Sequence, residues 1–134
     1  MQNEDDALIL VPVAIGELID KITILEIKSE RVADAGKLAN IRRELDLLCG
    51  VRDSRPARSD KTAGMSRELK AVNEAIWDIE DGVRDCERTQ DFGPRFVELA
   101  RGVYHNNDRR AALKRAINDA EGSPITEEKS YQPY

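Results

Sequence analysis

Residues 16–31, GELIDKITILEIKSER, limit the fold more than any other part of the chain, because they form a helical pattern with apolar side chains on nearly every side. At about 100° per residue, Ile24 and Ile27 lie almost opposite the broad apolar face. That face consists of Ile15, Leu18, Ile19, Ile22 and Leu25. A helix of this kind needs neighbours on two sides. The segment therefore predicts an all-α protein in which this helix is central.

The rest of the chain also has helical periodicity, and we expect a small bundle of four or five helices in a single domain, residues 1–134. The pattern predicts helices at about 15–34, 37–48 and 66–88, then a fourth from a cap at Asp91 and a fifth from Asn107 to Ala120, separated by the sequence HNND. A polar, extended leader is predicted at 1–10, a loop at 50–65 and an extended tail at 123–134.

Composition excludes several classes of function. The chain has 134 residues and a net charge of −5, which argues against a nucleic-acid-binding protein. No apolar run is long enough to cross a membrane, and the acidic QNEDD before ALILVPVAI is unlike a signal peptide, so we expect no membrane insertion and a cytoplasmic location. Cys49 and Cys86 are expected to be reduced, unpaired thiols.

Charged residues interrupt the apolar surface of the first helix. Glu17, Lys21 and Lys28 form a narrow stripe between two apolar flanks, and Asp20 lies next to it. One interpretation is an exposed ladder in which Glu17 and Lys21 pair across one turn. The other is a polar seam that faces another helix, where each charge must be paired or bound to a ligand.

The helix predicted at 66–88 has a similar design. Its core stripe is followed by a second row of Asn73, Trp77, Glu80 and Arg84. Trp77 is interpreted either as a half-buried anchor or as a platform for a sugar or a base.

The helix predicted at 107–120 supplies positive charge. Arg109 is expected on its apolar side, with Lys114 beside it. An arginine in that position needs a carboxylate or a phosphate, and Glu80 or Asp20 are candidate internal partners. The loop at 50–65 is also basic in part, and it is interpreted as a solvated connector in preference to an anion site.

Motifs for catalysis are missing from the sequence. There is no glycine-rich phosphate loop, no nucleophile elbow and no CxxC pair, and two cysteines with one histidine do not make a zinc site, so no metal ligands are predicted. One alternative is a Mg²⁺-dependent all-α nucleotide pyrophosphohydrolase, because ELID and DIED each carry two acids one helical turn apart.

Several long segments are specific when taken together: VPVAIGELIDKITILEIKSER, KLANIRRELDLL, LKAVNEAIWDIEDGVRDCE, FVELARGVYHNNDRRAALKRAIN and EEKSY. Together they resemble the DUF6165 family of small bacterial and phage proteins, a family with no established activity. The resemblance covers the chain from about Val11 to Tyr131. It carries over no catalytic residues, and it implies a link to surface-polysaccharide synthesis.

We therefore expect an anionic ligand, such as a sugar phosphate or nucleotide sugar, at an interhelical seam. Lys21, Lys28, Arg109 and Lys114 would hold the anion, and Lys129 and Tyr131 in the tail would close over it. The full set of candidates is Glu17, Asp20, Lys21, Lys28, Asn73, Trp77, Glu80, Arg84, Arg109, Lys114, Lys129 and Tyr131.

The alternative to a ligand-binding protein is a non-enzymatic helical adaptor in which the seam only fixes helix register. A homodimer is expected in either case, because a helical hairpin with apolar residues on two faces often completes its core by pairing with a second copy. The sequence leaves the question of a cofactor open.

Overall fold

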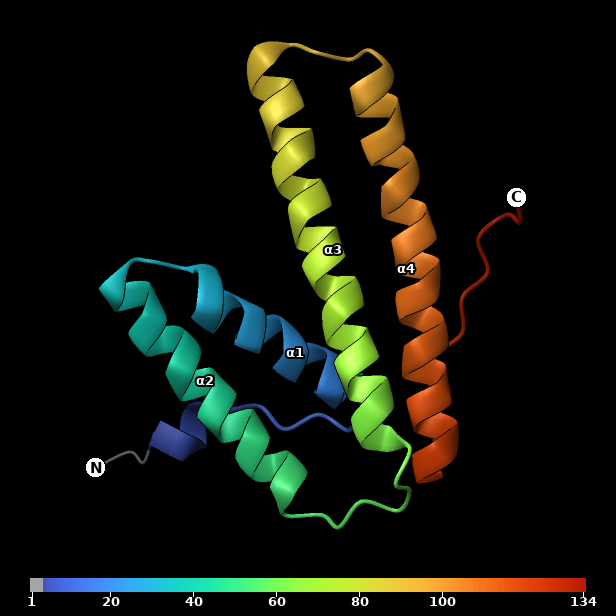
Figure 1. Cartoon of the computed structure of the whole chain (residues 1–134). Helices are drawn as coiled ribbons and strands as arrows, with labels where there is room; N and C mark the ends of the chain where they lie inside the picture. Colours follow the sequence, from blue (N-terminus) through green and yellow to red (C-terminus); the bar gives the residue numbers. More distant parts are fainter. Residues whose placement is uncertain (1–3) are drawn as a thin grey trace.

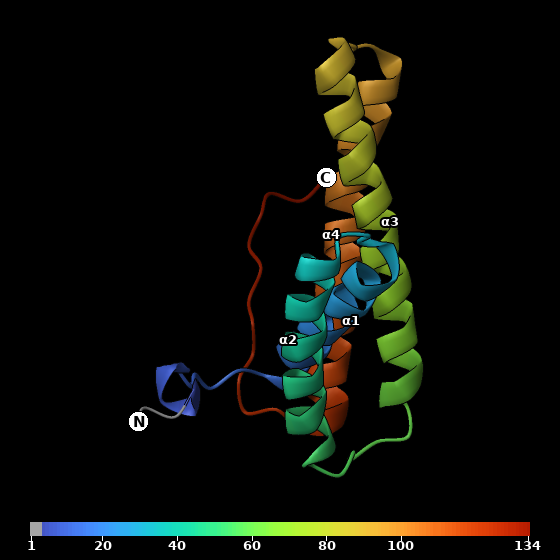
Figure 2. The same cartoon turned by 90° about the vertical axis from the view of Figure 1, so that its left-hand side faces the viewer.

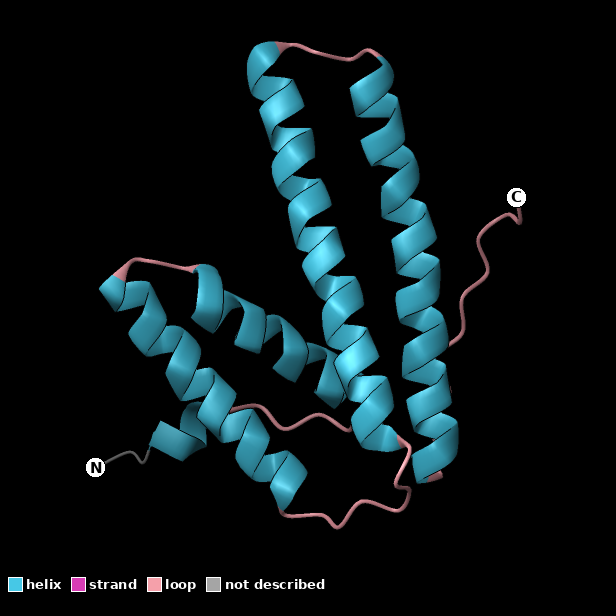
Figure 3. Ribbon diagram, in the orientation of Figure 1, coloured by secondary structure: helices cyan, strands magenta, loops and turns pink. Residues whose placement is uncertain are grey.

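The computed structural model describes residues 4–134, which form four α-helices after a short 3-10 turn at Glu4–Ala7 (Figure 1). The helices are α1 (Ile15–Arg31), α2 (Ala35–Asp53), α3 (Thr62–Thr89) and α4 (Pro94–Glu121). These described residues contain no strand (Figure 3). The prediction of a small all-α bundle is confirmed. Residues 1–3 of the predicted leader lie outside the described residues.

The number of helices is four because the sequence HNND does not interrupt α4. Asparagine and aspartate cost a helix only a few tenths of a kcal/mol each relative to other polar residues. Asn106 also returns its side-chain amide to the carbonyl of Gly102, at 2.8 Å. The predicted break at HNND, residues 105–108, is therefore wrong, and α4 is one helix of 28 residues.

Other predicted boundaries also moved. Helix α1 ends at Arg31 and not at Asp34, which instead caps α2 by accepting a hydrogen bond from the backbone N–H of Lys37 at 2.8 Å. Helix α2 continues through Gly50 to Asp53 and α3 begins at Thr62, so the connecting loop spans 54–61 and not 50–65. The predicted cap at Asp91 is also wrong, because α4 begins after Gly93.

Helix α1 is at the centre of the arrangement. Helices α3 and α4 form a long antiparallel hairpin, and α1 packs against the half of it that holds the start of α3 and the end of α4 (Figure 1). Helix α2 packs on α1 and on no other helix, and none of its residues is buried (Figure 2). The two apolar sides of α1 are thus covered from two sides, as its sequence predicts. The other half of the hairpin extends beyond α1 and α2.

Helices α1, α3 and α4 meet at Ile19, Leu69 and Ile117, which are nearly inaccessible to solvent. Next to this core, Gly16 brings the backbone of α1 against α4. A Cβ atom at Gly16 would lie 2.5 Å from the carbonyl oxygen of Lys114, and the Gly16 N–H donates to Oδ1 of Asn118 at 2.7 Å. This close approach fixes the position of α1 along α4. It therefore also fixes which charged residues of the two helices face each other.

Candidate functional site

A buried ion pair joins α1 to α4. Asp20 is 1% exposed, and both of its carboxylate oxygens accept hydrogen bonds from Arg110, from Nε at 2.9 Å and from Nη2 at 2.5 Å. Asn73 of α3 donates to the same carboxylate at 2.9 Å and to Oγ1 of Thr23 at 2.9 Å. This buried cluster of Asp20, Arg110, Asn73 and Thr23 connects three helices. The fork of the guanidinium fits the carboxylate in the two-point geometry that arginine favours.

The pKa of Asp20 reflects these contacts. Burial alone would raise the pKa of the carboxyl group, but the hydrogen bonds from Arg110 and Asn73 outweigh burial and hold the pKa below its ordinary value. The same pairing raises the pKa of Arg110 above its ordinary value. Asp20 is therefore held as a carboxylate, which suits a structural ion pair and does not suit a general acid.

A second ion pair lies one turn further along α4. Lys114, whose side chain is 10% exposed, donates from Nζ to Glu17 of α1 at 2.7 Å and lies 2.9 Å from a carboxylate oxygen of Glu127 in the tail. Burial would lower the pKa of Lys114, and the two carboxylates reverse that effect and raise it. Glu17 therefore pairs with Lys114. The exposed-ladder interpretation, which paired Glu17 with Lys21, is wrong.

All of these buried charges have partners. Within residues 6–134, no buried side-chain nitrogen or oxygen lacks a hydrogen bond. Of the polar seam predicted on α1, Glu17 and Asp20 face α4 and pair with its bases, whereas Lys21 is exposed. Such pairs contribute little net stability over apolar residues, but they penalise any other register of the helices.

A cleft of about 830 Å³, here called the tail cleft, lies between α4 and residues 127–131. Four of the predicted site residues line it: Glu17, Lys114, Lys129 and Tyr131. The structure therefore brings the tail over Lys114, as the prediction placed it.

The remaining predicted residues are dispersed. Lys21, Glu80 and Arg84 are exposed, and Lys28 is half-buried. Trp77 is also half-buried, with the guanidinium of Arg31 5.9 Å from its ring centre. These five lie outside the lining of the tail cleft.

The placement of Arg109 on the apolar side of its helix is wrong, and Arg110 takes that position. Arg109 is exposed, whereas Arg110 lies against Asp20. In a continuous helix Arg110 is seven residues before Ile117, so the two side chains differ by only about 20°. Arg109 is eight residues before it and lies about 80° away.

Sequence reasoning missed a second cleft, which lies under the loop 54–61. This loop cleft has a volume of about 700 Å³, within the usual range for small-molecule sites. Its floor is the Ile15, Ile19 and Ile22 face of α1, and its walls are the loop and the first two turns of α3. Charged residues surround this floor: Glu26, Arg52, Asp53, Arg55, Arg58, Asp60, Arg67, Lys70 and Glu121.

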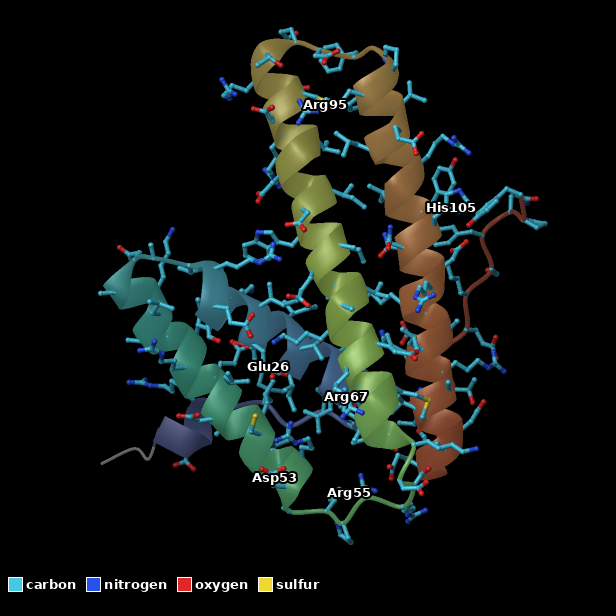
Figure 4. All side chains as sticks on the ribbon, viewed as in Figure 1. Glu26, Asp53, Arg55, Arg67, Arg95 and His105 are labelled. Atoms are coloured by element: carbon cyan, nitrogen blue, oxygen red, sulfur yellow. The ribbon has the colours of Figure 1, made fainter. Side chains whose placement is uncertain are left out.

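The charges around the loop cleft are only partly paired. Arg52 contacts its neighbour Asp53 at 2.9 Å, and Lys70 contacts Glu30 at 2.5 Å. In contrast, Arg55 and Arg67 make no ion pair with any side chain that the structure describes, residues 6–134. Figure 4 shows these two arginines near Glu26 and Asp53, around the end of the molecule that holds the loop.

Glu121, in the last turn of α4, holds the loop in place. It accepts a hydrogen bond from Oγ1 of Thr62 at 2.5 Å and another from the backbone N–H of Arg58 at 2.8 Å. These two bonds, that of Thr62 first, lower the pKa of Glu121 below its ordinary value. Gly122 follows with a φ of 67°, and a Cβ there would lie 3.1 Å from the guanidinium of Arg58. The glycine thus permits both the left-handed end of α4 and the close approach of the loop.

The chemistry available in the loop cleft is that of binding. Its lining contains arginine forks, the hydroxyl groups of Ser59, Thr62 and Ser66, and an aliphatic floor, with no histidine or cysteine among the lining residues. The signal in the sequence was the run of arginines and serines at 52–59, whose proximity to the isoleucine face only the fold reveals.

Acidic groups do not converge as the metal-dependent alternative requires. Among the described residues there is no group of three or more histidine, cysteine, aspartate or glutamate side chains arranged to hold a metal ion. Glu17 and Asp20 are each paired with a base of α4, and Asp78 pairs with Arg31 at 2.6 Å.

Comparison with known proteins gives one match. A family model described as a family of unknown function (DUF6165) matches residues 9–134, nearly the whole chain. The chain belongs to the DUF6165 family. No curated protein and no solved structure matches it. The DUF6165 match covers both clefts and every helix. No helix of the described residues is long and apolar enough to cross a membrane.

Proposed function

We propose that this protein binds a small molecule that carries a carboxylate or phosphate group on an apolar body, and that it does so in the loop cleft. The observation that supports the proposal is the presence of Arg55 and Arg67, without acidic partners in the described chain, beside a floor of isoleucines. The guanidinium groups would hold the anion, and the isoleucines would hold the apolar part.

The pairing of the charged side chains favours the loop cleft over the interhelical seam as the place where an anion binds. Asp20, Arg110, Lys114 and Glu17 already satisfy one another, so an anion that enters the seam has to break an existing pair. Breaking a buried pair costs about 3–5 kcal/mol. An anion that contacts Arg55 and Arg67 breaks no ion pair. We therefore propose that the anionic ligand expected from the sequence binds in the loop cleft and not at the interhelical seam.

The floor of the cleft also bears on the class of ligand. A bare sugar phosphate is polar throughout and gains little from Ile19 and Ile22, whereas a nucleotide sugar has a base that an aliphatic floor and an arginine can cover. Among the ligands expected from the sequence, we therefore favour the nucleotide sugar. A role in surface-polysaccharide synthesis and a cytoplasmic location belong to the same proposal.

The experiment is thermal unfolding of the purified protein with nucleotide sugars, nucleotides, sugar phosphates and dicarboxylates, each with and without Mg²⁺. A ligand at about 100 times its Kd adds about 2.7 kcal/mol to the free energy of unfolding. In a domain of this size that raises Tm by several degrees. Arg67→Gln should remove the shift without changing the Tm of the free protein.

The matched control is Arg43→Gln, which removes an exposed arginine of α2 that lies outside the cleft and makes no ion pair with the described residues. This control should keep the full shift. A shift that survives Arg67→Gln, or that Arg43→Gln also removes, would place the ligand elsewhere and contradict the proposal.

A second candidate function is that of an adaptor or dimerisation protein without enzyme activity. Two observations favour it: no residue of α2 is buried, and the segment 8–13 exposes apolar residues, among them Ile9 at 87% and Leu10 at 92%. Sedimentation equilibrium tests the dimer directly. A purely monomeric protein at micromolar concentration would contradict the homodimer.

A further inference from the structure

The tail, residues 123–134, returns along α4 (Figure 2). Its side chains hold it there through ion pairs and a hydrogen bond to α4. The backbone N–H of Ser123 bonds to the carbonyl of Asn118 at 2.9 Å, and beyond that point no backbone–backbone hydrogen bond joins the tail to the described helices. Its outer part is held at Asp108, which pairs with Lys129 and accepts a hydrogen bond from the Tyr134 hydroxyl at 2.6 Å. A segment attached in this way can leave the helix without breaking any secondary structure.

The part of α4 beneath the tail is basic. Lys114 and Arg115 are consecutive, and the tail sets two consecutive acids against them. Glu127 lies 2.9 Å from Nζ of Lys114, and Glu128 lies 3.6 Å from Nη1 of Arg115. Two linked carboxylates on two neighbouring cations reproduce the charge pattern of a diphosphate bound to lysine and arginine.

We propose that this basic stretch of α4 is a second anion site, for a diphosphate group, and that Glu127 and Glu128 occupy it as an internal ligand that the diphosphate displaces. The tail cleft gives the incoming group a space of about 830 Å³ beside Lys114. The site is separate from the loop cleft, with which it shares no lining residue.

The exposure of the two acids makes displacement feasible. Their side chains are 59% and 74% exposed, so their ion pairs are screened by solvent and salt and each holds the tail only weakly. Lys114 keeps its ion pair with the half-buried Glu17 throughout, which leaves the pairing between α1 and α4 intact when the tail departs. The diphosphate therefore competes only with the exposed carboxylates of Glu127 and Glu128, and not with Glu17.

Tryptic cleavage after Lys129 of the full-length protein measures the release of the tail, because a protease needs an extended, detached segment. Inorganic pyrophosphate should accelerate this cleavage. Sodium chloride at the same ionic strength should accelerate it less, and a chromogenic peptide reports any direct effect of pyrophosphate on the protease.

The decisive variant is Glu127→Gln/Glu128→Gln. Loss of two exposed ion pairs should release the tail and strengthen the binding of pyrophosphate, measured by calorimetry, by roughly three- to tenfold. The matched control is Glu98→Gln, which removes another exposed acid that pairs only on α4 itself, with Arg101. It should change neither cleavage nor binding.

Arg115→Gln tests the cation side and is preferable to a change at Lys114, because Arg115 is exposed and its loss leaves no buried charge unpaired. It should weaken pyrophosphate binding several-fold, whereas Arg67→Gln should not. The proposal is overturned if pyrophosphate does not bind, or if the double variant binds it no more tightly than the natural protein. Equal acceleration of cleavage by chloride and pyrophosphate would also overturn it.

Discussion

The buried cluster around Asp20 and the rim of the loop cleft both place arginine next to α1, yet they treat its charge in opposite ways. Arg110 gives the Nε and Nη2 edge of its guanidinium to both carboxylate oxygens of Asp20, which is 1% exposed. Arg55 and Arg67 make no ion pair with the described residues. A charge inside the core must be matched within the chain, whereas a charge at a water-filled cleft is free to meet a ligand. Pairing, more than residue type, separates structural arginines from candidate binding arginines in this protein.

The largest expected effect is a difference in stability between a substitution at the buried cluster, at Arg110, and one at the loop cleft, at Arg67. Arg110→Gln leaves the carboxylate of Asp20 buried and without its ionic partner, and we expect a loss of about 3–5 kcal/mol in the free energy of unfolding. Arg67→Gln removes an exposed charge and should change that free energy by less than about 0.5 kcal/mol. Urea denaturation of the two variants measures both values. Equal losses would show that the distinction between paired and unpaired arginines has no energetic basis.

A smaller effect is expected at Gly16, which sets the register of the buried cluster. Gly16→Ala introduces a Cβ atom 2.5 Å from the carbonyl oxygen of Lys114, so α1 and α4 must separate. We expect a loss of about 1–3 kcal/mol, because an overpacked contact shifts backbone on both sides. The matched control is Gly50→Ala in α2, where the new Cβ meets nothing within 4 Å. That change should stabilise the helix by about 0.5–1 kcal/mol, and destabilisation by both variants would contradict the argument from the close approach.

The smallest expected effect is the dependence of stability on acid. The pKa of Asp20 is lower in the folded protein than in the unfolded chain, so the unfolded chain binds this proton more readily. The stability that Asp20 contributes is complete above its unfolded pKa of about 4 and is lost as the pH falls through the lower, folded pKa. Asp20→Asn should reduce the decline of the free energy of unfolding between about pH 5 and pH 3.

The control for this measurement is Asp46→Asn, an exposed aspartate of α2 with no ion pair among the described residues. This variant should keep the slope of the natural protein. If Asp20→Asn kept the same slope as well, the buried carboxylate would not be the source of the acid sensitivity.

The sequence was sufficient for the fold class and for the central position of α1, because isoleucines on two sides of one helix leave few alternatives. It was also sufficient to find Glu17 and Asp20 on a polar seam. It was insufficient for the partner of Asp20 on α4, since Arg109 was assigned to the apolar side of the helix predicted at 107–120, although Arg110 lies closer in phase to Ile117.

The loop cleft could not be predicted from sequence, because its parts are far apart in the chain. Ile19 and Ile22 read as core, and Arg55 reads as a solvated loop residue. The bonds to Glu121 from the backbone N–H of Arg58 and from Thr62, 63 and 59 positions away, hold the loop over the isoleucines. Long-range contacts of this kind leave no periodic signal in the sequence.

The half of the α3–α4 hairpin that extends beyond α1 has a consequence for how the molecule opens. There α3 and α4 pack on each other and on no other helix, and the ion pairs across the turn include an exposed one between Arg95 and Asp85 at 2.9 Å (Figure 4). Two helices alone bury too little surface to be rigid in water, so this half should fray and re-form many times before the base opens once. We therefore expect this half of the hairpin to open locally more often than the half that packs on α1. Both proposed sites lie on the half that packs on α1.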